Sequence, residues 1–244
     1  MQTLFGLHAV RAALLRHPER VGLVRIAEGR DDLRMREIEQ LARRHGRTVQ
    51  RINAGKLKQL AGEVTHQGVL AEVEPMPPWS EDDLFEAAGA AASPLLLALD
   101  GVQDPHNLGA CLRTADACGA LAVIVPKDRA AQLNPTARKV AAGAAETTPV
   151  VAVTNLVRTL KLLKDANVWS VGADAEVDRP AHEADLTGGI VLVLGAEGAG
   201  LRQLTRQTCD FLVSLPQLGA VESLNVSVAA GMLLYEAVRQ RRSA

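Results

Sequence analysis

Apolar runs and amphipathic stretches alternate along residues 94–244. Short continuous apolar runs occur at 95–99, 121–125, 168–171, 190–194 and 211–213, mostly bounded by Gly, Pro or Asp. Runs of this kind are typical of parallel strands that are buried on both faces. Between them lie stretches with helical character, at 108–118, 136–142, 155–164, 201–208 and 224–239. The alternation predicts an α/β domain in which helices cover both faces of a parallel sheet.

The first 75 residues alternate in a similar way over shorter distances. They predict helices at 8–15, 33–45 and 56–61 and strands at 21–27, 48–52 and 68–73. In the second of these helices, Leu33, Ile38 and Leu41 mark an apolar stripe. The pattern predicts a small α/β or α+β domain.

The last helical stretch carries Leu224, Val228 and Met232 at four-residue steps. An apolar stripe at this spacing most simply predicts the face that packs on the core.

Composition changes between the two regions. Residues 76–93 read MPPWSEDDLFEAAGAAAS and combine Pro-Pro, an acidic run and an Ala/Gly tract. Such a segment predicts a linker with one short helix. The expected organisation is a domain at 1–75, a linker at 76–93 and a second domain at 94–244. Their formal net charges are +4, −4 and −1, so the small first domain is the basic one.

The positive charge of the first domain is mostly arginine. Its planar guanidinium suits phosphates and base edges. The residues concerned are Arg34, Arg36, Arg43, Arg44 and Arg47. Two interpretations stay open: they solvate a helix face, or they contact a nucleic acid.

Overall composition excludes several classes of protein. The chain is 48% apolar and 23% charged, as in ordinary globular proteins, and only 2% aromatic, which disfavours a surface of stacked aromatic platforms. Three cysteines without a CxxC pair suggest neither a zinc site nor a disulfide framework. The longest charge-free stretches, 87–99 and 223–235, have 13 residues each, whereas a membrane span needs about 20. The N-terminal residues lack the features of a signal peptide. We therefore expect a soluble cytoplasmic protein with no metal and no membrane partner.

Three segments that follow predicted strands carry the candidate chemistry, because open α/β sheets bind ligands at the carboxyl ends of their strands. They are 100–109, 195–200 and 215–225. The glycines of the second segment follow the order G-x-x-G-x-G, which is not the dinucleotide fingerprint. Its Glu197 either caps a helix that begins near Leu201 or faces a ligand held by the glycine-rich backbone. Both interpretations stay open on spacing alone.

The first segment leads into a helix with two candidate polar residues. Asn107 stands where an N-cap is expected. Arg113 lies nearly two turns into the helix, where its guanidinium either reaches solvent or is held in a polar cleft. An ion pair with Asp116 on the same helix is also open. His106 has no Ser or Cys nucleophile around it, so it is a weak candidate for catalysis.

At these segments the sequence resembles the SPOUT superfamily, and specifically its TrmH-like RNA ribose 2′-O-methyltransferases. The first motif is NLGACLRTA at 107–115, the second is GAEGAG at 195–200, and the third is Pro216 followed by SLNVS at 223–227. Residues 100–120 and 126–146, and the opening FGLHAV, are most similar to the group that methylates a guanosine of bacterial 23S rRNA.

The resemblance implies a fold and a cofactor. The fold is a trefoil-knotted parallel sheet preceded by a small RNA-binding domain, and the protein is a homodimer. The cofactor is S-adenosylmethionine, bound largely through main-chain groups. The implied cofactor-binding residues are Gly195, Gly198, Leu215, Pro216 and Leu224. The implied partners are 23S rRNA or a precursor of the large ribosomal particle, with no DNA.

The resemblance also implies the catalytic residues Arg113, Asn107, Glu197 and Asn225. The family assigns removal of the 2′-hydroxyl proton to the arginine, here Arg113. A guanidinium is almost never neutral in a protein, so an equally good interpretation is that Arg113 holds a phosphate and stabilises the developing alkoxide. Asn107 and Asn225 orient the hydroxyl and the loop, and Glu197 fixes the first-motif loop or Arg113.

Two other functions stay open at this point. One keeps the chemistry and takes tRNA as substrate. The other is a non-catalytic RNA-binding or ribosome-assembly factor, which the joint presence of Arg113, Glu197 and Asn225 argues against. Glu222 adds a negative charge near the supposed path of the RNA, which weakens any prediction of the nucleotide that is modified.

Overall fold

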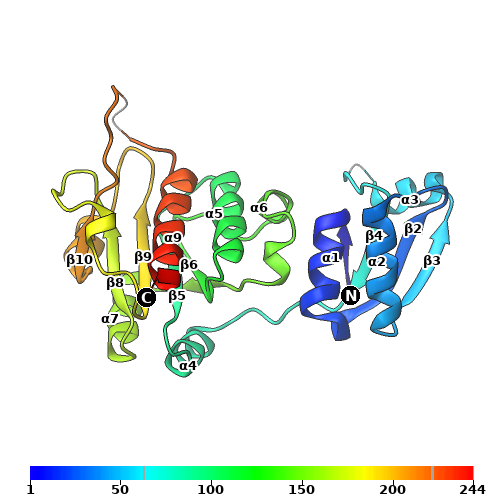
Figure 1. The fold of residues 1–244 in the computed structure, drawn as a ribbon, viewed down its shortest axis with the longest axis horizontal. Helices are drawn as coiled ribbons and strands as arrows, with labels where there is room; N and C mark the ends of the chain where they lie inside the picture. Colours follow the sequence, from blue (N-terminus) through cyan, green and yellow to red (C-terminus); the bar gives the residue numbers. More distant parts are fainter. Residues whose placement is uncertain (63, 221–222, 244) are drawn as a thin grey trace. The chain divides into compact units, whose positions relative to one another are not determined.

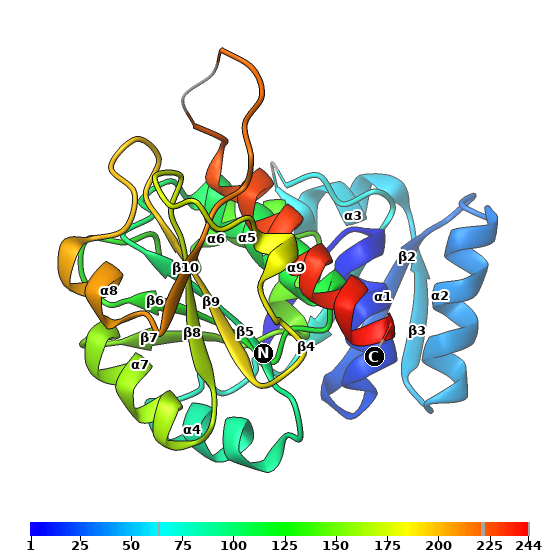
Figure 2. The ribbon, with the colours of Figure 1, turned by 60° about the vertical axis from the view of Figure 1, so that its left-hand side comes forward.

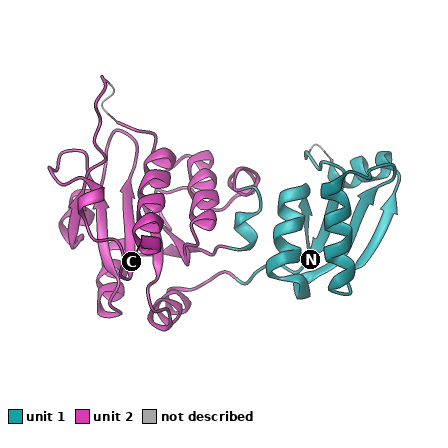
Figure 3. Ribbon diagram, in the orientation of Figure 1, with its two compact units in different colours: residues 1–77, 142–147 teal, residues 78–141, 148–244 magenta. Residues whose placement is uncertain are grey.

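The computed structural model describes residues 1–62, 64–220 and 223–243, so Glu222 lies outside the described residues. The chain forms two compact units (Figure 3). Unit 1 is Met1–Pro77 with Ala142–Thr147, and unit 2 is Pro78–Ala141 with Thr148–Ala244. The division after Pro77 falls inside the segment 76–93 that composition marked as a linker.

Unit 1 is a four-stranded sheet with helices on both faces (Figure 1). Its strands are β1 (Gln2–Phe5), β2 (Val21–Ala27), β3 (Thr48–Ile52) and β4 (Val69–Val73), in the order β1-β4-β2-β3. Only β2 and β3 pair in parallel. The helices are α1 (Leu7–Arg16), α2 (Leu33–Arg44) and α3 (Ala54–Ala61), with short 3-10 turns at η1 (Pro18–Arg20) and η2 (Ala144–Glu146). The sequence analysis predicted all three helices and missed the strand β1.

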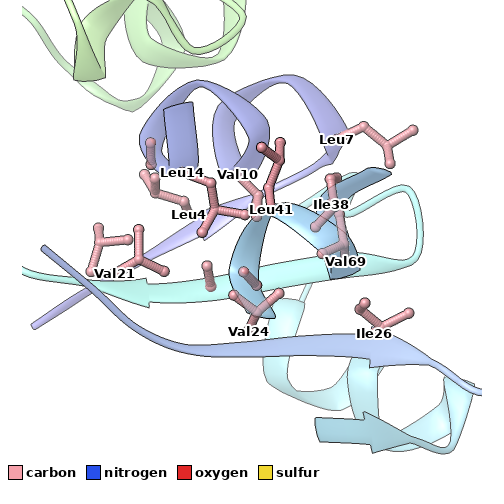
Figure 4. Close-up of a cluster of buried hydrophobic side chains, with 14 of the residues drawn as sticks. Leu4, Leu7, Val10, Leu14, Val21, Val24, Ile26, Ile38, Leu41 and Val69 are labelled. Atoms are coloured by element: carbon pink, nitrogen blue, oxygen red, sulfur yellow. The ribbon is translucent and has the colours of Figure 1, made fainter. Parts of the chain in front are cut away.

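The core of unit 1 lies between the sheet and helices α1 and α2. Val10, Leu14 and Ile38 pack there against Val24 and Val69 (Figure 4). A second, smaller cluster between α3 and the opposite face contains Ile52, Leu57 and Leu70.

Leu33 does not belong to the buried stripe of α2, contrary to the prediction. Its exposed fraction is 82%, and Met35 occupies the core position instead. Ile38 is five positions after Leu33, which places them well apart around a helix with 3.6 residues per turn. Met35 and Ile38 are three apart and share one face.

Unit 2 contains a six-stranded parallel sheet, which confirms the predicted α/β class (Figure 2). The spatial order is β10-β8-β9-β5-β6-β7. The strands are β5 (Leu95–Asp100), β6 (Ala122–Pro126), β7 (Val150–Val153), β8 (Trp169–Ala173), β9 (Ile190–Gly195) and β10 (Phe211–Val213). The short edge strand β7 was not predicted.

Helices cover both faces of this sheet, as the alternation predicted. They are α4 (Glu81–Ala90), α5 (Pro105–Ala117), α6 (Pro135–Val140), α7 (Leu156–Asp165), α8 (Gln203–Thr208) and α9 (Val226–Ser243), with a 3-10 turn at η3 (Ala181–Glu183). Helices α4 and α7 form one hydrophobic cluster with the sheet, while α5 and α9 pack against each other and against β5, β6 and β9 (Figure 2). No helix within the described ranges is long and apolar enough to cross a membrane.

Helix α4 is built into unit 2, although its sequence lies in the expected linker. Ser80 and Asp83 form a capping box at its start, which explains why the helix begins there. Leu84 and Ala88 are buried against the sheet. Glu81 accepts a hydrogen bond from the Thr154 amide at 3.1 Å, which ties the helix to the end of β7.

The predicted core face of α9 is wrong. The buried residues are Val226, Ala230, Leu233, Leu234 and Ala237. Val228 and Met232 are 50% and 47% exposed, and Leu224 precedes the helix. This helix is apolar on more than one side, so periodicity alone does not tell which side meets the sheet.

Candidate active site

Three loops meet at the carboxyl edge of the sheet in unit 2, because the strands that lead into them run parallel. Asp100 at the end of β5 is 1% exposed. It accepts hydrogen bonds from the backbone amide of Arg202 at 3.0 Å and from Arg202 Nε at 2.6 Å. This ion pair fastens the loop that follows β9 to the end of β5.

Asn107, Glu197 and Asn225 come together at this edge from three separate segments. Asn225 Nδ2 donates to Asn107 Oδ1 at 3.0 Å and also to Glu197 Oε1. Asn107 Nδ2 lies 3.4 Å from the same Glu197 oxygen, and the Val226 amide donates to it at 3.3 Å. Asn225 Oδ1 in turn accepts from the amide and hydroxyl of Ser227, at 2.9 and 2.6 Å. We call Asn107, Glu197 and Asn225 the amide–carboxylate cluster.

This cluster rules out two structural interpretations of its members. Asn107 is not the N-cap of α5, because Asp104 is, accepting from the His106 amide at 2.8 Å. Glu197 does not cap α8, which starts at Gln203 without a side-chain cap. The side chains of Asn107 and Glu197 instead form hydrogen bonds with Asn225 and with each other.

Arg113 lies apart from these contacts. It is exposed on α5, nearly two turns beyond Asn107. Its guanidinium makes no hydrogen bond or ion pair with any residue that the structure describes, so the pairing with Asp116 that their spacing allows is not made. The structure therefore brings together three of the four predicted catalytic residues and leaves the fourth as a solvent-facing cation.

A cavity of about 400 Å³ opens beside the cluster. Four of the five predicted cofactor-binding residues line it, namely Gly195, Gly198, Leu215 and Leu224, and so does Glu197. Pro216 is exposed and is not among its lining residues within the described ranges.

Backbone geometry explains the glycines of this cavity. A Cβ on Gly195 would lie 1.9 Å from the carbonyl carbon of Gly200, because the loop 196–200 folds back over it. The Gly200 amide donates to the Ala196 carbonyl at 2.9 Å and closes the loop. Gly198 and Gly200 have φ of +73° and +65°, a region that L side chains rarely adopt.

Sequence reasoning missed four polar residues of the cavity wall: Asp174, Glu176, Arg206 and Gln217. Asp174 follows β8, forms an ion pair with Arg206 of α8, and accepts from the Glu176 amide at 2.9 Å. Burial raises the pKa of Asp174, but the hydrogen bonds from Arg206 and the Glu176 amide outweigh it and hold the pKa below its usual value. Asp174, Glu176 and Arg206 lie outside the three candidate segments, and Gln217 lies within 215–225 but is not one of the motif residues, so no periodicity or motif marked their side chains.

The family of the chain follows from these features and from sequence comparison. Residues 94–235 match the SpoU rRNA methylase family, and residues 3–79 match the substrate-binding domain of RNA 2′-O ribose methyltransferases. The chain belongs to the SpoU rRNA methylase family.

Curated relatives are similar over their whole length. The 23S rRNA (guanosine-2′-O-)-methyltransferase RlmB of Escherichia coli K12 is 50% identical over 240 residues, covering 98% of this chain and 99% of the relative. The RlmB of Pseudomonas aeruginosa is 54% identical over 241 residues, covering 98% and 97%.

Solved structures agree with the fold. The SpoU methyltransferase AviRb from Streptomyces viridochromogenes, in complex with AdoMet, matches with a TM-score of 0.76 and 28% identity, covering 99% of this chain and 91% of AviRb. A crystal structure of an RNA 2′-O ribose methyltransferase matches with a TM-score of 0.73 and 25% identity, covering 98% and 88%.

Proposed function

We propose that the protein transfers a methyl group from S-adenosylmethionine to the ribose 2′-hydroxyl of a guanosine in 23S rRNA. The observation that carries this function is the amide–carboxylate cluster beside a glycine-lined cavity, in a chain 50% identical to RlmB from end to end. The protein is an RNA methyltransferase, and its N-terminal unit is a substrate-binding domain.

The cavity fits the cofactor. The loop 195–200 is held so tightly that even a methyl group on Gly195 would clash, which leaves main-chain amides and carbonyls as the wall. Gln217 offers a buried amide oxygen with no hydrogen-bond partner among the described residues. When bound there, S-adenosylmethionine supplies an electrophilic methyl group on its sulfonium.

Within the proposal, the amide–carboxylate cluster is a positioning device. Glu197 Oε1 already accepts from Asn225 and the Val226 amide and lies within reach of Asn107, so this oxygen is occupied. The carboxylate holds the two amides in fixed orientations. Asn225 uses both of its amide hydrogens within the cluster and accepts twice from Ser227, so it holds Asn107 in place, and the Asn107 amide orients the attacking hydroxyl. Orientation of an in-line displacement supplies a large part of the rate.

The proposed role of Arg113 is to stabilise negative charge on the RNA. Its exposed guanidinium is available to an RNA phosphate and to the alkoxide that develops as the 2′-hydroxyl loses its proton. A charged guanidinium is a poor base, so its chemistry favours a stabilising role over direct proton abstraction.

The first experiment measures methyl transfer with labelled S-adenosylmethionine. Unmodified 23S rRNA, 16S rRNA and bulk tRNA are offered separately, and label is mapped by resistance of the backbone to alkaline cleavage. Label at one guanosine of 23S rRNA is expected. Label only in tRNA would overturn the substrate. Label in a precursor particle but not in free 23S rRNA would assign the assembled particle as the substrate.

A pair of variants tests the role of Arg113. Arg113→Ala is expected to abolish transfer while S-adenosylhomocysteine binding and Tm stay as in the wild type. Arg158→Ala is the matched control, because Arg158 is an exposed arginine on α7, on the opposite face of the sheet. Near-normal turnover of Arg113→Ala would defeat the assignment.

The five arginines that the sequence analysis singled out in unit 1 differ in their partners. Arg36 and Arg43 are exposed and pair with Asp31 and Glu39, which matches the interpretation as a solvated helix face. Arg47 lies beyond the end of α2, is half-buried and donates to the His45 carbonyl. The side chains of Arg34 and Arg44 have no partner among the described residues. We propose that these two contact the RNA.

We also propose a homodimer. Its support is the exposed apolar stripe of α9, where Val228, Met232 and Tyr235 are 50%, 47% and 67% exposed. Light scattering is expected to give twice the chain mass for the wild type and the chain mass for the double variant Val228→Asp, Met232→Asp. A monomeric wild type would contradict the proposal.

We further propose that unit 2 is a trefoil knot and that the protein is cytoplasmic. The support for the knot is the strand order, in which β9 lies between β8 and β5 while β10 pairs with β8 at the edge. After β10 the chain returns to α9, which packs against β9 and α5.

A further inference from the structure

Gln217 is the one residue whose side-chain oxygen is buried without a hydrogen-bond partner in the part of the chain that the structure describes. It follows β10 in the third-motif segment and lines the cavity beside the glycine loop. A buried acceptor without a donor is unfavourable, and native proteins rarely keep one unless a ligand or water satisfies it. A ligand that brings an N–H or O–H donor to the Gln217 side-chain oxygen would therefore bind favourably in this cavity.

The other residues that line the cavity indicate which part of the cofactor supplies that donor. Val213, Leu215, Leu224 and Val226 line the same cavity with apolar side chains. Adenine is the flat, weakly polar part of S-adenosylmethionine, so it matches these walls best. The carboxylates of Asp174 and Glu176 line the cavity too, and they suit the hydroxyl and ammonium groups of the cofactor.

A primary amide is chemically complementary to adenine. It presents one acceptor and one donor side by side, and the adenine edge presents the 6-amino donor next to a ring-nitrogen acceptor. The pairing would satisfy the orphaned oxygen and read the one group that distinguishes adenine from unsubstituted purine.

We propose that Gln217 is a specificity-determining residue that accepts a hydrogen bond from the 6-amino group of the cofactor's adenine. The proposal rests on the proposed function, since it assigns a contact within the same cavity. It adds a side-chain contact for the adenine to a wall in which main-chain groups and apolar side chains lie beside the charged groups of Asp174, Glu176 and Arg206.

The test compares two ligands by calorimetry: S-adenosylhomocysteine and its analogue in which unsubstituted purine replaces adenine. The wild type is expected to bind the analogue about tenfold more weakly, the loss that corresponds to one hydrogen bond. Gln217→Met removes the amide at similar length and is expected to bind both ligands equally. Gln217→Glu keeps an acceptor and is expected to restore the preference. Gln207→Met, on the exposed side of α8 away from the cavity lining, is the control and should behave as wild type.

Stability without ligand separates this role from a structural one. If the Gln217 oxygen is hydrogen-bonded only when a ligand is present, Gln217→Met should leave the Tm of the ligand-free protein unchanged or raise it. The reason is that the substitution removes an unpaired buried oxygen. A clear drop in Tm would indicate a structural role and overturn the proposal, as would a preference for adenine that survives in Gln217→Met. Equal binding of both ligands by the wild type would also overturn it. Failure of the proposed function is distinguishable, because the wild type would then bind neither ligand and transfer no methyl group to RNA.

Discussion

Gly195 is the position where one added methyl group should lower the affinity of the protein for its cofactor. A Cβ built there lies 1.9 Å from the Gly200 carbonyl carbon, 2.0 Å from its oxygen and 2.3 Å from the Leu201 amide nitrogen. Nonbonded carbons prefer a separation of about 3.5 Å or more. The loop must therefore move away by roughly 1.5 Å, and every contact is with backbone, which has no rotamer to change.

The expected size of the effect follows from the cost of overpacking. Forcing an extra methyl group into a well-packed site costs about 1–3 kcal/mol. If the loop moves and the cavity wall with it, the affinity for the cofactor falls by roughly 5- to 150-fold. Gly195→Ala should thus weaken S-adenosylhomocysteine binding in calorimetry by this factor and slow methyl transfer when S-adenosylmethionine is limiting.

Gly219→Ala is the matched control. Gly219 lies in the neighbouring loop, a Cβ there meets nothing within 4 Å, and its φ is not in the left-handed region. This variant should bind and turn over as the wild type does. Wild-type affinity and Tm in Gly195→Ala would refute the reasoning, since they would mean that the loop yields without cost.

The remaining predictions concern stability and thiol reactivity. Arg241 donates to the main-chain carbonyls of residues 93, 94, 186 and 188 and so holds the end of α9 against the rest of unit 2. Arg241→Gln should therefore lower the free energy of unfolding in urea by about 1–3 kcal/mol. An unchanged urea midpoint would contradict this. Burial raises the pKa of the Cys111 and Cys209 thiols to about 12, so at pH 8 both should react with a disulfide reagent far more slowly than in the urea-unfolded chain; equal rates would show that the thiols are accessible. Burial raises the pKa of Asp210, but the ion pair with Lys164 and the hydrogen bonds from its neighbours hold it below the usual value of 3.8. Asp210→Asn should therefore destabilise the protein at pH 7, and the stability difference should shrink as the pH falls below 3.8 through the lowered native pKa; a difference that is constant from pH 7 to pH 2 would exclude this linkage.

Much of the strand and helix pattern was predictable because buried positions carry apolar residues, and their spacing along the chain differs between strands and helices. The predicted ranges of β2, β3 and β10 coincide with the observed ones, and β9 extends the predicted run by one residue. Strands β1 and β7, of four residues each, were missed, whereas the three-residue β10 was predicted. In β1 only Leu4 is buried, so this strand carries no continuous apolar run.

The faces of helices were predicted less well. Leu33 and the stripe of Val228 and Met232 are apolar yet exposed. Periodicity reports that a side is apolar, and the neighbouring elements decide which side is covered.

For the candidate site too, some features could be predicted from the sequence and others could not. The amino-acid sequence alone determined the two-part organisation, the α/β class and the three motif segments, because these depend on local patterning and on residue types at fixed spacing. Only the tertiary structure decided that Asn107, Glu197 and Asn225 share hydrogen bonds across 118 positions of chain while Arg113 does not, and that Gln217 is left with an unpaired oxygen in the cavity wall. Contacts of this kind are set by how the strands order themselves in the sheet, and no local pattern of residues encodes that order.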